Sequence, residues 1–336
     1  MSLKMKSSPA DPKWKVMRGK LAVWYHPAKR DLPWRRTTDP YAITVSEIML
    51  QQTQVVTVIP YYERWLKSFP TWQALAAAKE TAVIKAWEGL GYYRRARNLH
   101  ALAKAVVLNG GELPRSAEGL IALPGIGPYT AAAIGSIAFG LPVAVLDGNV
   151  MRVLTRLLAL RDDISLPPTR MKLQQIADHL LDPCDPSSHN QAMMELGATI
   201  CLPRNPMCLI CPLTEECRGR DQAEDFPVKT RVAQEQRTET VAVLTRGKSF
   251  YCEQVPEGKP WHGLWHFPDF NPARMTPGEP LARIKYGITK YSVTMQAVAA
   301  KWKTRVPPGG RYLTLEQMRT LAFAAPHRKL ARLLER

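Results

Sequence analysis

Long apolar runs, acidic charge and dispersed cysteines are all scarce in this chain of 336 residues. No stretch approaches the roughly 18 consecutive apolar residues that a membrane-spanning helix needs. The lysines near the N-terminus (Lys4, Lys6, Lys13 and Lys15) are followed by no apolar segment, so we do not expect a secretory signal. The length suggests two domains, because domains usually contain roughly 100–200 residues.

Acidic residues are outnumbered by basic ones. The chain has 46 lysines and arginines against 29 aspartates and glutamates, which gives a formal net charge of +17. Such an excess favours a polyanionic partner, and nucleic acid is the leading candidate because no segment resembles a membrane-lying helix. Hydrophobic residues make up 46% of the chain and charged residues 22%, a balance that excludes wholesale disorder.

Cysteine is rare as well, and four of the six cysteines fall in one short segment with the spacing C-x6-C-x2-C-x5-C: Cys201, Cys208, Cys211 and Cys217. A secreted disulfide framework would disperse its cysteines, so we expect a metal or cluster site in a reducing compartment, the cytoplasm. Four thiolates suit either tetrahedral zinc or a 4Fe-4S cluster. One continuous loop can wrap a larger object, which favours the iron–sulfur cluster over zinc.

The first two thirds of the chain have helical periodicity. Apolar residues between Val150 and Leu158, for example, recur at the spacing of one helix face. Residues 221–239 are polar and charged, which is typical of a linker. We therefore expect a loose basic segment at 1–13, a mainly α domain at 14–220 and a linker at 221–239.

Beyond the linker the apolar period changes to two. Apolar residues alternate with others at 241–243 and again at 293–297, as they do in half-buried strands. The segment 314–317 fits the capping box of a late helix, which we expect Pro326 to interrupt. Residues 240–336 should therefore form a smaller α+β domain.

Two carboxylates lie in apolar surroundings. We place Glu47 on a helix whose apolar stripe continues through Ile48 and Ile59, with Gln52 on the same stripe. Burial would raise the pKa of Glu47, the condition for a general acid near neutral pH, although a charge near a helix N-terminus is an equal alternative. Asp147 follows an apolar run and either caps the next helix or lies beside a ligand pocket.

Two further segments could bind a nucleic acid. Residues 123–130 form a Gly-rich turn before an Ala-rich helix, and glycines together with a helix N-terminus suit a phosphate, although the segment could be a turn alone. Residues 87–100 interleave aromatic residues with three arginines. Phosphates attract the cations and an unstacked base step takes a planar wedge, although a solvated helix face is the alternative.

Together and in this order, these segments closely resemble MutY-type adenine DNA glycosylases of the endonuclease III superfamily. The resemblance covers residues 18–220 and rests on the four cysteines and on VSEIMLQQTQV (45–55), WEGLGYYRRARNLH (87–100), LPGIGPYTAAAI (123–134) and VLDGNVMRVLTRLL (145–158). Two shorter segments, Trp34-Arg35 and Glu195-Leu196-Gly197-Ala198, also match. It implies a six-helix barrel with a helix-hairpin-helix and a 4Fe-4S module. It also implies base excision repair by a monomer that flips adenine, mispaired with 8-oxoguanine or guanine, out of duplex DNA.

The resemblance also implies roles for individual residues. Glu47 would protonate the adenine, and Asp147 would stabilise the sugar cation that forms. Tyr129 and Asn149 would support that pair. The residues implied to contact DNA are Gln51, Gln52, Thr53, Tyr92, Arg94, Gly125 and Gly127. Bifunctional relatives carry a Schiff-base lysine where this chain has Tyr129, so we expect a monofunctional enzyme with at most weak strand cleavage.

The C-terminal part resembles the family's NUDIX-like domain through residues 261–268. The glutamate-rich helix of NUDIX hydrolases is missing from the sequence, so nucleotide hydrolysis is not expected. In relatives this domain reads 8-oxoguanine with a Phe-Ser/Thr-His loop. Here Ile288, Thr289 and Lys290 stand at that place, so we expect Thr289 and Lys290 to contact the DNA with an altered preference for 8-oxoguanine.

Two other functions fit parts of the sequence. One is a thymine or oxidised-pyrimidine glycosylase of the same superfamily, although Tyr129 argues against its lyase forms. The other is a non-catalytic iron–sulfur protein that senses DNA lesions or redox state. The presence of both Glu47 and Asp147 argues against the second.

Overall fold

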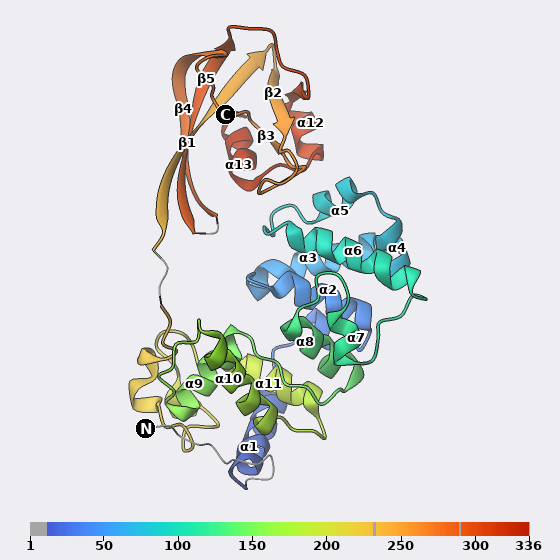
Figure 1. Ribbon diagram of the computed structural model, residues 1–336, viewed down its shortest axis with the longest axis vertical. Coiled ribbons are helices and arrows are strands. Elements are labelled where there is room, and N and C mark those ends of the chain that lie inside the picture. Colours follow the sequence, from blue (N-terminus) through green and yellow to red (C-terminus); the bar gives the residue numbers. More distant parts are fainter. Residues whose placement is uncertain (1–11, 231–232, 289, 336) are drawn as a thin grey trace. The chain divides into compact units, whose positions relative to one another are not determined.

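The computed structural model describes residues 12–230, 233–288 and 290–335 (Figure 1). Contacts divide the chain into two compact units. The first contains Met1–Ala77 and Asn98–Thr230, and the second contains Ala78–Arg97 and Arg231–Arg336. No helix in the described ranges is long and apolar enough to cross a membrane.

Residues 12–230 contain helices and turns but no strand among those that are described. The α-helices are α1 (Pro12–Ala28), α2 (Pro40–Leu50), α3 (Val55–Ser68), α4 (Trp72–Ala77), α5 (Glu80–Ala86), α6 (Arg94–Leu108), α7 (Ala117–Ile121), α8 (Pro128–Phe139), α9 (Gly148–Leu158), α10 (Pro167–Leu180) and α11 (Pro186–Thr199). Three short 3-10 helices accompany them: η1 (Pro33–Arg35), η2 (Cys208–Ile210) and η3 (Arg220–Asp225).

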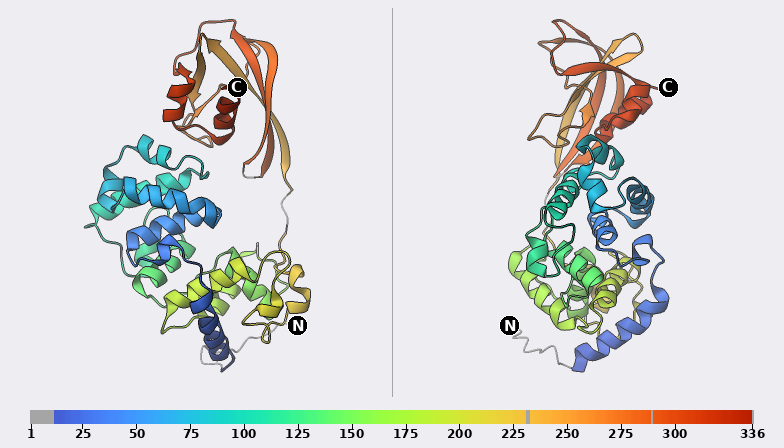
Figure 2. Two further views of the ribbon diagram at one scale, coloured as in Figure 1. Left: turned by 180° about the vertical axis from the view of Figure 1, so that it is seen from behind. Right: turned by 90° about the vertical axis from the view of Figure 1, so that its right-hand side faces the viewer.

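The core of the first unit lies where α9, α10, α11 and α1 pack together (Figures 1 and 2). The stripe predicted on α9 is buried there, with Val150, Leu154 and Leu157 each no more than 2% exposed. Each such side chain contributes roughly 1.5–3 kcal/mol of burial free energy. This packing holds the N-terminus of α9, and with it Asp147, in a fixed place.

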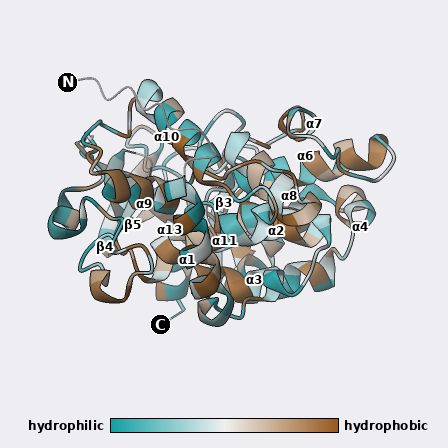
Figure 3. Cartoon of the chain, turned by 90° about the horizontal axis from the view of Figure 1, so that it is seen from below, coloured by the Kyte–Doolittle hydropathy of each residue, from teal (hydrophilic) through white to brown (hydrophobic). Residues whose placement is uncertain are grey.

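The single helical stripe predicted through Glu47 and Ile59 is wrong, because two helices meet there. Asp39 caps α2, which ends at Leu50. Gln52 then adopts a left-handed conformation with φ 56°, and α3 begins at Val55. Apolar periodicity continued across the break because both helices bury apolar faces, and α3 carries both brown and teal residues in Figure 3.

The Gly-rich turn joins α7 to α8, as expected for a helical hairpin. Gly125 has φ +76°, and a Cβ there would lie 2.5 Å from Cβ of Asn98. Glycine is therefore required by both backbone conformation and space. Gly127 is the N-cap of α8, and Pro128 occupies the first turn, where its missing N–H costs nothing.

The second unit contains α5, the start of α6, a sheet and two C-terminal helices. The strands are β1 (Glu235–Arg246), β2 (Ser249–Gln254), β3 (Trp265–His266), β4 (Met275–Ile288), β5 (Tyr291–Trp302) and β6 (Gly310–Thr314). In the described residues the order is β3-β2-β1-β5-β4, and β6 also pairs with β2. Strand β1 runs parallel to β5, while β4 and β5 form an antiparallel pair.

Helices α12 (Leu315–Thr320) and α13 (Ala325–Leu333) cover one face of this sheet (Figure 1). The alternating residues of 241–243 and 293–297 are buried against them, as predicted. The capping box at Thr314 and Gln317 is also confirmed. Pro326 does not interrupt one helix, however; it lies in the first turn of α13, where proline is favoured.

The predicted linker at 221–239 overlaps structured elements. η3 occupies its start, and β1 begins at Glu235, before the predicted border at residue 240. Residues 235–239 are exposed on both faces and therefore polar, so they lack the alternation of apolar residues that predicts a strand. Their backbone nevertheless pairs with β5.

Segment 78–97, expected in the helical domain, groups with the C-terminal residues. Glu88 explains this grouping, because its Oε1 accepts hydrogen bonds from the backbone N–H of Phe323 at 3.1 Å and from Nε of Arg328 at 2.8 Å. Lys85 donates to Oε2 of Glu88 at 2.5 Å and to the carbonyl of Arg319 at 2.6 Å. An isolated charged residue produces no periodic pattern in the sequence, so the sequence did not indicate these contacts of Glu88 and Lys85.

Candidate active site

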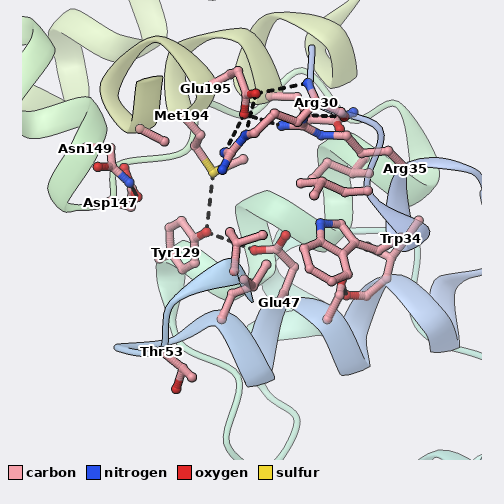
Figure 4. Close-up of a pocket in the computed structure, with 18 residues that line it drawn as sticks. Arg30, Trp34, Arg35, Glu47, Thr53, Tyr129, Asp147, Asn149, Met194 and Glu195 are labelled. Atoms are coloured by element: carbon pink, nitrogen blue, oxygen red, sulfur yellow. Dashed lines mark hydrogen bonds and ion pairs between the residues drawn. The ribbon is translucent and has the colours of Figure 1, made fainter. Parts of the chain in front are cut away.

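A cavity of about 180 Å³ in the first unit brings together all the residues predicted to be catalytic (Figure 4). Glu47 comes from α2, Tyr129 from the first turn of α8, and Asp147 and Asn149 from the start of α9. Three segments that are distant in sequence therefore converge on one pocket.

Glu47 is 5% exposed on α2. Burial raises the pKa of its carboxyl to about 7; the hydrogen bond from Tyr129 opposes this shift and the charge of Asp147 adds to it. The Tyr129 hydroxyl donates to Oε2 of Glu47 over 2.9 Å. The carboxyl can therefore hold a proton at neutral pH and still be ionised readily.

Asp147 caps α9 and lines the cavity at once. Its Oδ1 accepts the backbone N–H of Val150 at 2.7 Å, and its Oδ2 accepts Nδ2 of Asn149 at 2.9 Å. Burial raises the pKa of Asp147, and these hydrogen bonds act in the opposite direction. The two interpretations of this residue from sequence are thus compatible.

Hydrogen bonds and packing also fix the side chain of Asn149. Arg152 donates from Nη2 to Oδ1 of Asn149 at 2.8 Å and to the carbonyl of Gly197 at 2.7 Å. A Cβ at Gly197 would lie 2.6 Å from Cβ of Asn149, so only glycine lets α11 approach this closely. The amide that supports Asp147 is positioned by packing as well as by hydrogen bonds.

One wall of the cavity contains an ion-pair network that was not assigned a role from sequence. Glu195, 1% exposed, receives Nε and Nη2 of Arg30, both at 2.7 Å, and Nη2 of Arg35 at 2.9 Å. Burial alone would raise the pKa of Glu195, but the two arginines lower it to about 2. Met194 was missed too; its sulfur lies 3.5 Å from the Tyr129 hydroxyl.

The four clustered cysteines line a second small cavity of this unit, beside Arg156. All are free thiols in the structure. Arg156 is 1% exposed and donates from Nη1 to the sulfur of Cys201 at 3.3 Å and to the carbonyl of Leu202 at 2.6 Å. Among the described residues, no three Cys, His, Asp or Glu side chains converge on one point as the ligands of a single metal ion would.

Five predicted DNA contacts lie in the first unit. Gln51 donates from Nε2 to the hydroxyl of Thr130 at 3.1 Å, while Thr53 lines the catalytic cavity. Gln52 is exposed, with the left-handed φ of 56° noted above. Gly125 is exposed and Gly127 half-buried at the hairpin turn. Left-handed backbone at a residue other than glycine is uncommon and concentrates at functional sites.

The remaining predicted DNA contacts belong to the second unit. Tyr92 is 56% exposed with φ 48°, and Arg94 beside it is exposed. Lys290 is exposed and forms an ion pair with Glu235. Thr289 lies outside the described residues.

Comparisons with known proteins agree with this fold. A family model described as HhH-GPD superfamily base excision DNA repair protein matches residues 45–183. A solved thermostable thymine-DNA glycosylase is 29% identical and aligns over 64% of this chain and all of its own, with a TM-score of 0.58. An endonuclease III–DNA complex, 23% identical with a TM-score of 0.55, shares the fold.

Two relatives resemble the chain over most of their own length. An adenine DNA glycosylase of Homo sapiens is 35% identical over 95% of this chain and 74% of the relative. One of Mycolicibacterium smegmatis is 41% identical over 68% of this chain and 77% of the relative.

The helical fold and the matching repair family define a DNA glycosylase with an endonuclease III-like N-terminal part. Within that class, the chain belongs to the adenine DNA glycosylase family.

Proposed function

We propose that this enzyme excises adenine mispaired with 8-oxoguanine or guanine from duplex DNA, as a monomer and without a lyase step. The observation that carries the proposal is the convergence of Glu47, Tyr129 and Asp147 on one cavity. The family relationship points to the same substrate. A buried cavity requires that the base leave the duplex, which is how enzymes reach a base for chemistry.

Glu47 is the general acid in this mechanism. Because its pKa is about 7, a large fraction carries a proton at neutral pH and can transfer it to a ring nitrogen of the flipped adenine. Protonation makes the base a leaving group, and the N-glycosidic bond breaks with its electron pair going to the base. The hydrogen bond from Tyr129 then stabilises the carboxylate that remains.

Asp147 acts on the sugar. Departure of the base leaves an oxocarbenium-like cation, which a nearby carboxylate stabilises as in glycoside hydrolysis. Water then forms the new bond to the anomeric carbon and gives a proton to the Glu47 carboxylate, so an abasic site and free adenine result and the acid is restored. Asn149 and the backbone of Val150 hold the Asp147 carboxylate in place.

The lining of the cavity supports the proposal that there is no lyase step. Strand scission through an imine needs an amine, and the described residues that line the cavity include arginines but no lysine. Tyr129 stands at the place of the lysine in bifunctional relatives, and a phenol cannot form an imine.

The cysteine cavity fits a 4Fe-4S cluster held by Cys201, Cys208, Cys211 and Cys217. Four thiols surround one small cavity, and their spacing within one continuous loop, which can wrap a larger object, favours an iron–sulfur cluster over zinc. When bound, the cluster supplies a rigid structural centre. Arg156 neutralises thiolate charge there, and Arg152 links the Cys201 carbonyl to Asn149.

Residues of each unit are proposed to contact DNA. In the first unit, the hairpin turn with Gly125 and Gly127 presents the N-terminus of α8 to a phosphate, and Gln51, Gln52 and Thr53 contact DNA. In the second unit, Tyr92, Arg94 and Lys290 contact DNA, and Gln52 and Tyr92 are the residues proposed to probe and wedge the duplex. Thr289, proposed as a further contact, lies outside the described residues. The helical unit would correspond to a six-helix barrel and the sheet unit to a NUDIX-like domain.

Single-turnover excision on four duplexes tests this function: adenine opposite 8-oxoguanine, adenine opposite guanine, thymine opposite guanine, and an oxidised pyrimidine opposite guanine. Alkali added afterwards reveals abasic sites. We expect adenine release from the first two, with strand breakage only after alkali. Cleavage at pyrimidines, or binding without release, would point to one of the two other functions considered above.

A further inference from the structure

One end of the sheet in the second unit carries an excess of positive charge that has no role in the proposed excision. Strands β1 and β5 end there, and β2 and β4 begin there (Figure 1). Three segments meet at this end: 246–249, 271–275 and 300–306. They contribute six exposed basic residues, which we call the basic end: Arg246, Lys248, Arg274, Lys301, Lys303 and Arg305. The same segments contain no aspartate or glutamate.

The charges of the basic end are not neutralised by the protein itself. Among the described residues, none of the six basic side chains forms an ion pair with a carboxylate. Uncompensated cations gathered in one area create a positive potential, which attracts a polyanion.

Contacts with the ends of the strands hold two of these residues in place. The guanidinium of Arg246 lies over the ring of Tyr312, 4.2 Å from its centroid. Lys303 donates from Nζ to the carbonyl of Pro272 at 2.8 Å, and its backbone N–H donates to the carbonyl of Arg274 at 2.9 Å. The positive charge is therefore attached to the end of an ordered sheet and not to a loose tail.

The composition of the basic end fits a phosphate backbone better than a protein partner. The centres of protein–protein interfaces are rich in apolar and aromatic residues, and lysine is depleted in them. None of the large hydrophobic side chains that are exposed in the described ranges falls in 246–249, 271–275 or 300–306. Lysine and arginine without an apolar anchor are typical of sequence-independent contacts with phosphates.

The basic end is distant from the turn that is proposed to contact the mispair. Strand β5 runs from Tyr291, next to Lys290, to Trp302. A strand rises about 3.3 Å per residue, so the two ends of β5 are roughly 36 Å apart. A duplex of about 15 base pairs with a central mispair extends only about 25 Å to either side, because each base pair adds about 3.4 Å. Such a duplex, with its mispair at Lys290, does not reach the basic end.

We propose that the basic end binds the phosphate backbone of a second, undamaged duplex while the first duplex holds the mispair. This inference rests on the proposed function, because that function places the mispair beside Lys290. The contact has no sequence preference, since phosphates are the same at every base pair. A protein that holds two duplexes can pass from one to the other without first being released, which assists the search for a rare mispair in undamaged DNA.

Titration of the preloaded protein tests this site. The intact protein is first saturated with an unlabelled duplex of about 15 base pairs, one and a half helical turns, that contains adenine opposite 8-oxoguanine. A fluorescent undamaged duplex of the same length is then added. We expect fluorescence anisotropy to show saturable binding of one further duplex per chain, with an affinity that falls as the salt concentration rises.

Lys301→Gln combined with Arg305→Gln should weaken this second binding event. Loss of two phosphate contacts should lower the slope of log affinity against log salt by about 2 and weaken binding roughly tenfold. The rate of adenine release from the preloaded duplex should not change, because that duplex does not touch the basic end.

Lys329→Gln combined with Arg332→Gln is the matched control, since it removes one lysine and one arginine from exposed positions of α13 in the same unit. It should leave the second titration unchanged. The proposal is overturned if the preloaded protein binds no second duplex, if the two double variants weaken binding equally, or if Lys301→Gln with Arg305→Gln slows excision. Unchanged DNA binding in that variant would point to an acidic protein partner and would also overturn it. Failure of the first duplex to bind or to release adenine would instead contradict the proposed function.

Discussion

The hydroxyl of Tyr129 lies 2.9 Å from Oε2 of Glu47 and donates a hydrogen bond to it. This bond favours the ionised carboxyl, whereas burial favours the protonated one and prevails, raising the pKa of Glu47 to about 7. Tyr129 therefore adjusts the acidity of Glu47 from the position that would hold the lysine of a lyase. This single pair connects the proposed acid catalysis with the proposed lack of strand scission.

Tyr129→Phe should shift the pH dependence of excision. The acid must be protonated, so the wild-type single-turnover rate should fall as pH rises through about 7. Without the donated hydrogen bond the pKa of Glu47 rises further, and the fall should begin at a higher pH. Rates between pH 5 and 9 measure the shift. Tyr61→Phe, which is outside the cavity, should leave the profile in place; an unchanged profile in Tyr129→Phe would argue against the coupling.

Asp147→Asn separates capping from catalysis. Asparagine caps helices about as well as aspartate, so the fold and the binding of mismatched DNA should persist. The negative charge beside the sugar is lost, and excision should fall by roughly a hundredfold or more. Asp185→Asn is the control, because Asp185 caps α11 through the N–H of Ser188 at 3.0 Å, away from the cavity. Equal rates in wild type and Asp147→Asn would favour a non-catalytic binding protein.

Cys208→Ser should remove iron from the purified protein. Serine is a poor ligand for an iron–sulfur cluster, so the iron content should fall well below the four atoms per chain expected for a 4Fe-4S cluster. Cys184→Ser changes an exposed cysteine outside the cysteine cavity and should retain full iron. Elemental analysis by mass spectrometry distinguishes the cases, and zinc in place of iron in the wild type would contradict the proposal.

Glu88→Gln should loosen the attachment of segment 78–97 within the second unit. The substitution leaves Arg328, whose side chain is 15% exposed, without its carboxylate partner. Loss of one partner of a half-buried pair costs about 2 kcal/mol. Hydrogen exchange of 78–97 should speed up accordingly. Glu80→Gln breaks a pair whose glutamate is 54% exposed and should have little effect; equal effects would refute the anchoring role.

Periodicity predicted α9 and two of the strands because one face of each is buried. The α9 stripe and the strands at 241–243 and 293–297 follow that rule. It failed at Gln52, where two helices share an apolar environment across a left-handed turn, and at β1, whose first residues are exposed on both faces. Only backbone pairing defines a strand there, and side-chain patterns do not report it.

The residues proposed to be catalytic were singled out because the segments that carry them resemble the glycosylase family, and the structure brings them together at one cavity. The contacts that support them could not be predicted. Glu195 is a polar residue on a helix, and nothing in its spacing indicates two arginines converging on it from the segment before α2. The same holds for Gly197, whose importance arises from its contact with Asn149.

The most direct test of the account compares wild type with Glu47→Gln on a duplex containing adenine opposite 8-oxoguanine, with released adenine measured by chromatography. Glutamine keeps the shape of the side chain but cannot deliver the proton, so we predict that the variant binds the duplex normally and releases adenine roughly 100- to 10,000-fold more slowly. The wild-type duplex should break only after alkali. Adenine release at the wild-type rate by Glu47→Gln would contradict the central claim.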